Sequence, residues 1–256
     1  MTSPDPTVVA RLRAAGCVFA EDEAVLLEAA AQTPAERDGL VARRVAGEPL
    51  EQVLGWAEFC GQRFVVEPGV FVPRRRTQLL VDAAVAVGGP GAVVLDLCCG
   101  VGAVGAAVAT ALGGVELHAA DVDPAAVRCA RRNLAGLGAV YEGDLFDPLP
   151  VALAGRVDLL VVNAPYVPTA AIALMPPEAR DHEARAALDG GADGLVVHRR
   201  VAAGARRWLA PGGTLLIETS RRQAPGTQAL VAGAGLAARV LTDDELDGTA
   251  VVGRLG

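Results

Sequence analysis

The chain contains no lysine, and all 23 of its basic residues are arginines. This absence excludes mechanisms that need a lysine amine, such as Schiff-base chemistry, and it excludes the phosphate-binding lysine of a P-loop. With 30 acidic residues, the chain has a formal net charge of −7 at pH 7. Because proteins that bind nucleic acid usually present a basic face, this acidic balance argues against DNA or RNA as a partner.

Cysteine is scarce, and its pattern is not that of a disulfide framework or a zinc site. The five cysteines are odd in number and include no CxxC pair. This pattern argues against both kinds of site, and no metal centre is expected. Adjacent Cys98 and Cys99 are expected to serve as small residues at the end of a strand.

Long apolar runs are absent, although hydrophobic residues make up 52% of the 256 residues. No stretch reaches the about 18 apolar residues that a membrane-spanning helix needs. The first residues, MTSPDPTVVARLR, lack the basic region and apolar core of a signal peptide. We therefore expect a cytoplasmic protein with a sizeable core and no membrane partner.

The order of patterns along the chain predicts three regions. Residues 1–54 carry short helical patterns and are expected to form a small helical domain. Residues 55–75 alternate around turn signals and are expected to form a β-hairpin linker, with Trp56 and Phe59 in its core. In residues 76–256, apolar strands alternate with helical patterns, which is typical of a parallel, doubly wound α/β sheet.

The third region can be divided further into expected elements. Its strands are expected at residues 92–97, 115–121, 157–162 and 214–219, with closing strands after Leu236. Its helices are expected at residues 77–87, 103–112, 124–134 and 195–209.

A glycine motif lies at the end of the first of these strands. Gly100, Gly102 and Gly105 fit GxGxxG, follow a strand and open a helix. Glycine allows a tight turn and a close approach of the backbone to a ligand. Asp121 follows about 20 residues later, where a carboxylate can accept both ribose hydroxyls. This spacing fits NAD as well as S-adenosylmethionine (SAM), so an NAD-dependent oxidoreductase remains an alternative at this point.

Polar residues at four successive strand ends favour SAM. These residues are Asp96, Asp121, Asp144 and Asn163. Asp96, in D-x-C-C-G-x-G, is expected to face the ammonium group of SAM, which a dinucleotide lacks. Asp144, in GDLFDPLP, is expected to meet the adenine amino group. Because the carboxyl ends of parallel strands form a ligand crevice, we expect these side chains to surround one site.

The tetrapeptide Asn163-Ala164-Pro165-Tyr166 follows the strand VDLLVV and suits methyl transfer to a planar nitrogen. In-line displacement needs a positioned nucleophile, and an amide nitrogen is a poor one because its lone pair is delocalised. The Asn163 side-chain oxygen and the Ala164 carbonyl can accept hydrogen bonds from its two N–H groups and stabilise developing positive charge. Pro165 stiffens the turn, and Tyr166 offers a flat wall.

At these motifs the chain resembles the HemK/PrmC family of protein N(5)-glutamine methyltransferases. The resemblance runs in the family's order over roughly residues 43–220. The matching stretches are RRVAGEPLEQVLGWAEF, FVPRRRTQLLVD, VLDLCCGVGAVGAAVA, GDLFDPLP, VDLLVVNAPYVP, MPPEARDHEARAALDGGADGL and LAPGGTLLIETS.

The resemblance implies a Rossmann-like SAM-dependent methyltransferase domain behind a substrate-recognising N-terminal helical domain. It implies a glutamine in the Gly-Gly-Gln loop of a class 1 peptide release factor as the acceptor. Asn163 and the Ala164 carbonyl would hold that amide, with Pro165 and Tyr166 completing the catalytic set. The residues expected to bind SAM are Arg74, Thr77, Asp96, Gly100, Gly102, Asp121, Val122, Asp144, Leu145 and Asn163.

The chain also departs from the family's pattern. Ala164 replaces the first proline of Asn-Pro-Pro-Tyr, and Arg74-Arg75-Arg76 stands where the family has Arg-Pro-Glu. Glu183-Ala184 replaces a Glu-Pro pair. These changes keep other acceptors open: another protein, a small amide, or a nucleobase amino group. They also keep open a SAM-binding protein without catalysis.

Some remaining polar residues carry weaker expectations. His118 is expected to be structural, His182 could line the substrate mouth, and His198 is expected on a helix surface. Arg75 and Arg76 are expected to be solvated, with Arg74 alone near the cofactor. Glu178, Asp181 and Glu183 are expected to form an acidic rim or a solvated loop, and Glu218 could support the site from behind.

Overall fold

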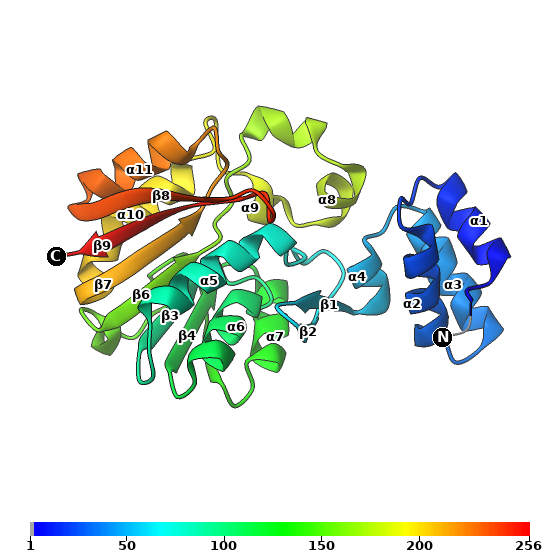
Figure 1. The fold of residues 1–256 in the computed structure, drawn as a ribbon, viewed down its shortest axis with the longest axis horizontal. Coiled ribbons are helices and arrows are strands. Elements are labelled where there is room, and N and C mark those ends of the chain that lie inside the picture. The colour runs from blue at the N-terminus through cyan, green and yellow to red at the C-terminus, as the bar shows by residue number, and fades with distance from the viewer. Residues whose placement is uncertain (1–2) are drawn as a thin grey trace.

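The computed structural model describes residues 3–256 and shows a group of helices beside a larger α/β unit (Figure 1). The first group comprises α1 (Pro6–Ala14), α2 (Ala20–Ala30), α3 (Pro34–Val45) and α4 (Leu50–Leu54). These helices bury their own apolar cluster, which includes Leu12, Leu27, Val41 and Val53. A buried ion pair between Arg44 and Glu23 joins α3 to α2 through two hydrogen bonds of 2.6 and 3.1 Å.

A short hairpin, β1 (Trp56–Phe59) and β2 (Gln62–Val65), connects this group to the rest of the chain. It is shorter than the predicted hairpin, because Pro68 and Gly69 break the second strand pattern. Phe59 is buried in the main core, as expected. Trp56 is only half-buried, and the Arg63 guanidinium lies 4.0 Å from its ring centre, so the prediction of a core tryptophan is wrong.

The α/β unit is built on one seven-stranded sheet with the order β5-β4-β3-β6-β7-β9-β8. The strands are β3 (Val93–Leu97), β4 (Glu116–Asp121), β5 (Gly138–Glu142), β6 (Val157–Val162), β7 (Leu209–Glu218), β8 (Leu236–Asp243) and β9 (Gly248–Leu255). Strands β3 to β7 pair in parallel, and β9 pairs antiparallel with both β7 and β8. The predicted doubly wound, Rossmann-like sheet and its closing strands are confirmed.

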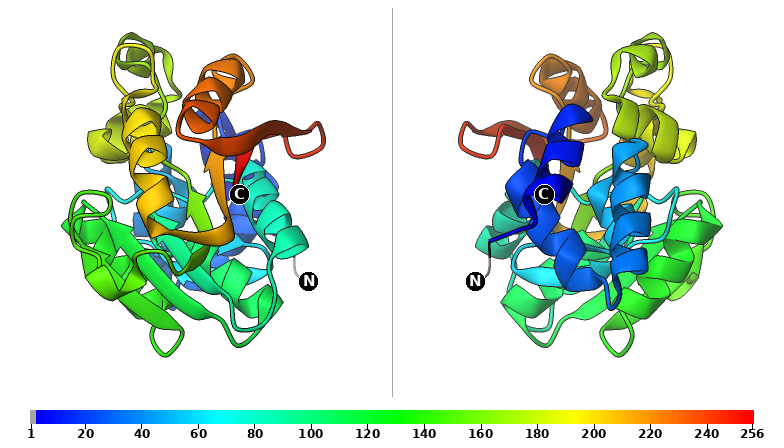
Figure 2. Two further views of the ribbon diagram at one scale, coloured as in Figure 1. Left: turned by 90° about the vertical axis from the view of Figure 1, so that its left-hand side faces the viewer. Right: turned by 90° about the vertical axis from the view of Figure 1, so that its right-hand side faces the viewer.

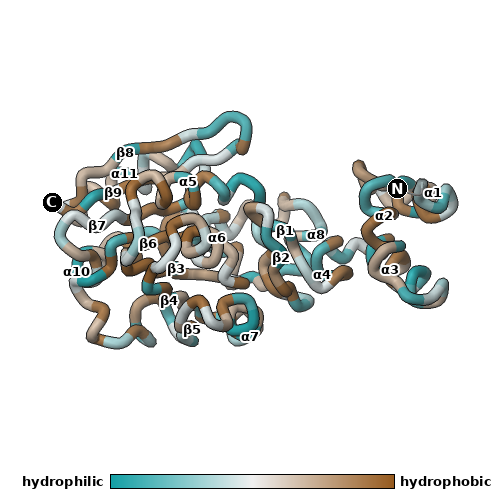
Figure 3. The backbone as a smooth tube through the Cα atoms, turned by 60° about the horizontal axis from the view of Figure 1, so that its bottom comes forward, coloured by the Kyte–Doolittle hydropathy of each residue, from teal (hydrophilic) through white to brown (hydrophobic). Residues whose placement is uncertain are grey.

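Helices cover both faces of the sheet, as Figure 2 shows. These helices are α5 (Gln78–Val87), α6 (Ala103–Leu112), α7 (Pro124–Asn133), α10 (Val196–Trp208) and α11 (Ala224–Gly233). Along β3, Val94 belongs to the cluster with α5, α6 and α7, whereas Leu95 belongs to the cluster with α10 and α11. Because both faces are buried, the strands read as continuous apolar runs, which Figure 3 shows at the centre of the unit.

His198, on α10, corrects one prediction. Its side chain is fully buried rather than on the surface. Its Nδ1 lies 3.0 Å from Thr227 Oγ1 on α11, and its ring lies beside that of Tyr166, with centres 6.4 Å apart. Burial lowers the pKa of His198 to about 4, so the ring is neutral near pH 7.

The segment between β6 and α10 contains three short helices: η3 (Thr169–Leu174), α8 (Pro177–His182) and α9 (Arg185–Leu188). Gln52 of α4 holds this segment through its side-chain amide. Its Nε2 donates a hydrogen bond of 3.1 Å to the His182 carbonyl and one of 3.0 Å to the Val70 carbonyl. Arg44 contacts Glu178 of α8 at 2.6 Å. The N-terminal helices therefore support the α8–α9 segment directly. No helix of residues 3–256 is long and apolar enough to cross a membrane.

Candidate cofactor and acceptor site

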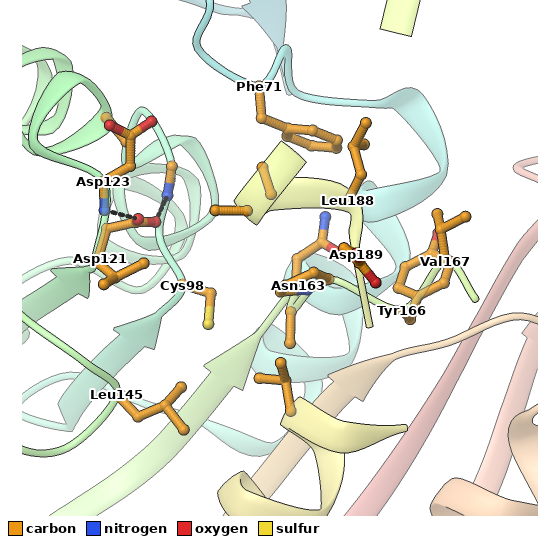
Figure 4. A pocket seen from close by; sticks show the side chains of 18 of the residues that line it. Phe71, Cys98, Asp121, Asp123, Leu145, Asn163, Tyr166, Val167, Leu188 and Asp189 are labelled. Carbon is orange, nitrogen blue, oxygen red and sulfur yellow. Dashed lines mark hydrogen bonds between the residues drawn. The ribbon is translucent and has the colours of Figure 1, made fainter. Parts of the chain in front are cut away.

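A cavity lies at the carboxyl ends of β3, β4 and β6, where the chain switches from one side of β3 to the other. Figure 4 shows Cys98, Asp121 and Leu145 on one side of it, and Asn163, Tyr166 and Leu188 on the other. The predicted site residues that line it are Arg74, Gly100, Asp121, Val122, Asp144, Leu145, Asn163, Ala164, Pro165 and Tyr166. Thr77, Asp96, Gly102 and His182 are not among its lining residues.

The glycine loop forms the floor of the cofactor end. Its residues Cys98, Gly100 and Gly102 have φ angles of 58°, 55° and 80°. A Cβ built on Gly100 would meet nothing within 4 Å, so the loop backbone lies open to the cavity. Gly102 instead is the N-cap residue of α6, and a Cβ there would lie 3.0 Å from Leu134. Gly102 therefore shapes the loop from behind.

Asp121 ties this loop to the end of β4. Its Oδ2 accepts the Gly100 N–H at 2.8 Å, and its Oδ1 accepts the Asp123 N–H at 2.9 Å. Burial raises the pKa of Asp121. Each carboxylate oxygen keeps a second lone pair, so Asp121 can hold the loop and still accept two hydroxyl groups.

Asp144 also lines the cavity, and it is paired with a residue that the sequence did not indicate. Arg200 of α10 donates two hydrogen bonds to its carboxylate, at 2.7 and 3.1 Å, and also lines the cavity. The two residues are 56 positions apart, so no local pattern indicates their contact. The apolar side chains of Val122 and Leu145 line the cavity together with Asp144 and Asp121.

Asp96 supports the glycine loop from below. The residue is 2% exposed, and its Oδ2 accepts the Gly105 N–H at 2.8 Å. A Cβ on Gly105 would come within 3.0 Å of that oxygen, which explains the third glycine of the motif. Burial raises the pKa of Asp96 to about 7. The structure thus assigns Asp96 a hydrogen bond to the start of α6 and does not place it on the cavity wall.

Asn163 stands at the end of β6, between the cofactor and acceptor ends of the cavity. Its Nδ2 donates to Thr77 Oγ1 at 3.3 Å, and Thr77 is almost fully buried at 2% exposure. This contact uses the amide nitrogen and directs the Oδ1 acceptor elsewhere. Ala164 and Pro165 follow Asn163 on the cavity wall.

Tyr166 is anchored at its hydroxyl end by a buried carboxylate. The hydroxyl donates to Glu218 Oε1 at 3.0 Å, and Arg76 Nε donates to the same oxygen at 3.4 Å. Glu218 is 3% exposed, as expected for a residue that supports the site from behind. Arg76 is exposed, as predicted, but it also lines the cavity, which the sequence did not indicate.

A second buried carboxylate holds Arg74. Glu183 Oε1 accepts from Arg74 Nη2 at 2.6 Å and from the Val72 N–H at 3.2 Å. The Glu183 side chain is completely buried, so it does not belong to an acidic rim. Arg74 also lies over the Phe71 ring, 5.1 Å from its centre. The adjacent Asp181 is exposed and pairs with Arg180.

The residues of the cofactor end fit SAM. Asp121 supplies carboxylate oxygens for ribose hydroxyls, and Gly100 leaves backbone open beside it. Val122, Leu145 and Val197 provide an apolar wall for a planar base. The lining acids Asp121 and Asp123 suit a ligand that carries positive charge.

Comparison of the sequence with known proteins shows its relatives. The sequence model of the methyltransferase small domain family matches residues 61–201. A release factor glutamine methyltransferase of Geobacter sulfurreducens is 43% identical over 189 residues, which cover 73% of this chain and 66% of that protein. A release factor glutamine methyltransferase of Cereibacter sphaeroides is 38% identical over 218 residues, 85% of this chain and 77% of that protein.

A third relative carries a different name. A 4-amino-L-phenylalanine/4-methylamino-L-phenylalanine methyltransferase of Streptomyces pristinaespiralis is 37% identical over 203 residues, 76% of this chain and 69% of that protein. The chain thus spans about two thirds of the length of the first relatives it matches.

Solved structures agree on the fold. A methyltransferase from Pyrococcus furiosus superposes with a TM-score of 0.59 at 16% identity, covering 84% of this chain and 97% of that chain. A T. thermophilus 16S rRNA methyltransferase in complex with AdoMet and guanosine gives a TM-score of 0.56 at 21% identity, covering 78% of this chain and 50% of that chain. At these identities the likeness shows a methyltransferase fold.

Replacing Asp121 tests the cofactor end. In Asp121→Asn, an amide N–H₂ group takes the place of one oxygen that accepts a backbone N–H or a ribose hydroxyl, and the negative charge is lost. We expect SAM binding to weaken by about tenfold or more, measured by calorimetry. Asp147→Asn, at an exposed acid off the cavity, is the matched control and should bind SAM like the wild type. A dissociation constant for Asp121→Asn equal to the wild-type value would contradict the assignment.

Asp96 predicts a pH dependence of stability. Its folded pKa of about 7 lies above the unfolded value of about 3.9. The stability that it contributes is therefore complete below about pH 4 and is lost as the pH rises through 7. Asp96→Asn keeps an oxygen for the Gly105 N–H but does not titrate. Its unfolding free energy, relative to wild type, should rise by more than about 1 kcal/mol from about pH 5 to about pH 8.

This difference is measured by urea unfolding without SAM at several pH values. Asp147→Asn, at an exposed acid, should give a difference from wild type that does not change with pH. If the difference in unfolding free energy between Asp96→Asn and wild type also did not change with pH, Asp96 would be ionised in the folded protein throughout this range.

Proposed function

We propose that this chain methylates the side-chain amide nitrogen of a glutamine in a peptide chain release factor. The chain belongs to the methyltransferase small domain family and, within it, to the HemK/PrmC glutamine methyltransferases. Its methyl donor is SAM. The observation that carries the proposal is the position of Asn163, which lies on the cavity wall between the cofactor end and Tyr166. The named relatives support glutamine as the acceptor.

The chain's own residues would position and polarise the acceptor amide. Bound SAM supplies a methyl group on a positively charged sulfur, open to in-line attack. Asn163 Oδ1 and the Ala164 carbonyl would accept one hydrogen bond each from the acceptor N–H groups. These two acceptors aim the nitrogen and stabilise the positive charge that develops on it.

Tyr166 would form the flat wall on which the planar amide packs. Glu218 holds its hydroxyl, so the ring keeps one orientation while the acceptor binds. Phe71 and Leu188 line the cavity opposite the cofactor end and would exclude water from the reacting atoms.

The N-terminal helices, residues 1–54, would recognise the release factor. They hold the α8–α9 segment through Gln52 and Arg44, and residues 186–189 of that segment line the acceptor end. A protein bound to these helices would thus present its loop beside the cavity mouth. The hairpin region, residues 55–75, would act as the linker, and residues 76–256 as the methyl-transfer domain. Translation factors act in the cytoplasm, where this reaction would take place.

A second candidate acceptor is the amino nitrogen of a small aromatic amino acid. The Streptomyces relative is named for such a substrate. The acceptor end carries apolar side chains that suit an aromatic ring, among them Phe71, Met175 and Leu188. Ala164, in place of the family's proline, keeps the carbonyl but leaves the turn less rigid.

Transfer of tritium from labelled SAM tests the proposed acceptor. We expect label on a purified class 1 release factor and none on the variant whose Gly-Gly-Gln glutamine is replaced. If only 4-amino-L-phenylalanine were labelled, the acceptor would be the small aromatic amino acid and not the release-factor glutamine. Absence of label on both, with SAM binding shown by calorimetry, would overturn both acceptors.

Asn163 is the residue on which turnover should depend most. Asn163→Ala removes one of the two acceptors that hold the nitrogen, and we expect kcat to fall by about 100-fold or more. SAM affinity should change little, because Asp121, Gly100 and Asp144 remain. Thr77→Val removes only the contact that orients the Asn163 amide, so kcat should fall by a smaller factor. Single-turnover assays and calorimetry measure both effects, and unchanged turnover in Asn163→Ala would rule out this mechanism.

A further inference from the structure

Two of the arginines that line the cavity are each held from behind by a buried carboxylate. Arg74 is paired with Glu183 at 2.6 Å, and Arg76 is paired with Glu218 at 3.4 Å. The side chains of the two glutamates are 0% and 4% exposed. Because the carboxylates lie behind the arginines, the guanidinium groups form the part of each pair that a ligand can reach.

Arg76 has N–H donors that its ion pair with Glu218 does not use. Its bond to Glu218 uses Nε, which leaves the N–H groups on Nη1 and Nη2 for a ligand. Its side chain is 43% exposed, compared with 30% for Arg74. Arg74, in addition to its ion pair, packs over the Phe71 ring. Arg76 is therefore the freer of the two cations.

Arg76 flanks the place where the acceptor would lie. Arg76 and the Tyr166 hydroxyl donate to the same Glu218 oxygen, so the guanidinium lies near the hydroxyl end of the aromatic wall. The next residue, Thr77, holds the Asn163 amide. A ligand that packs on Tyr166 with its nitrogen at Asn163 would thus extend towards Arg76.

The acidic residue at this end does not offset the positive charge of Arg76. Asp189 lines the cavity, but its carboxylate accepts from Thr169 Oγ1 at 2.6 Å and pairs with Arg185 at 3.2 Å. The HemK/PrmC family, which this chain resembles, has a glutamate at the position of Arg76. A glutamate there would repel a carboxylate. In this chain the sign of the charge at that position is reversed.

We infer that Arg76 binds the carboxylate of a small acceptor, so that the cavity takes, besides the proposed glutamine, a planar amine or amide with a carboxylate at its far end. A guanidinium matches a carboxylate with two parallel hydrogen bonds, which gives both affinity and orientation. The inference rests on the proposed methyl transfer at Asn163 and names a second substrate class for that site, because a glutamine within a protein chain carries no free carboxylate. Arg74, at a position that surrounds the cofactor in the family, is left for the carboxylate of SAM.

Calorimetry with two matched probes tests the inference without turnover. The protein is first saturated with S-adenosylhomocysteine, and p-aminohydrocinnamate or its neutral carboxamide is then titrated. The carboxylate should bind the wild type at least about tenfold more tightly than the carboxamide, as one charge-assisted pair requires. Arg76→Gln should remove this preference. Arg75→Gln, at an exposed neighbour that does not line the cavity, should keep it.

Each other outcome overturns the inference. Equal binding of the two probes, or no binding of either, would show that no carboxylate site exists at the acceptor end. If Arg76→Gln still bound the carboxylate more tightly than the carboxamide, another residue would be the one that binds the carboxylate. Weaker binding of S-adenosylhomocysteine itself to Arg76→Gln would show that Arg76 binds the cofactor carboxylate. If the probes behave as expected but no acceptor is methylated, the proposed function fails while the carboxylate site stands.

Discussion

The parallel pairing of β3 with both β4 and β6 is the constraint on which the site depends. Because these strands run in the same direction, their carboxyl ends meet at one edge and bring Gly100, Asp121 and Asn163 to one cavity. The Gly100–Asp121 hydrogen bond then ties the ends of two neighbouring strands together. Helices on both faces exclude water from the sheet, so the cavity opens only where the strands end.

Buried acids fix the polar side chains around this cavity. Glu218 orients Tyr166 and Arg76, Glu183 orients Arg74, and Asp96 holds the start of α6. A buried carboxylate is costly unless it is hydrogen-bonded, so each of these groups stabilises only one arrangement of its partners. The site is thus preorganised from behind, while the surfaces that meet ligands keep free donors and acceptors.

The cofactor end was largely predictable from sequence, because its residues lie at strand ends and in a glycine loop, which are local patterns. The long-range ion pairs around the cavity were not. Arg200 meets Asp144 across 56 residues, and Glu183 meets Arg74 across 109. His198 and Glu183 occupy positions that looked exposed, since a helix or a loop alone does not reveal what packs against it.

The sequence by itself determined the strand and helix order, the glycine turn and the Asn-Ala-Pro-Tyr end of β6, because apolar periodicity and turn residues act within a few positions. Only the tertiary structure decided which charges meet. It removed Asp96 from the cavity wall, buried Glu183 and placed Arg76 on that wall. The physical reason is that burial and ion pairing depend on elements far apart in the chain, which meet only when the sheet and its helices have packed.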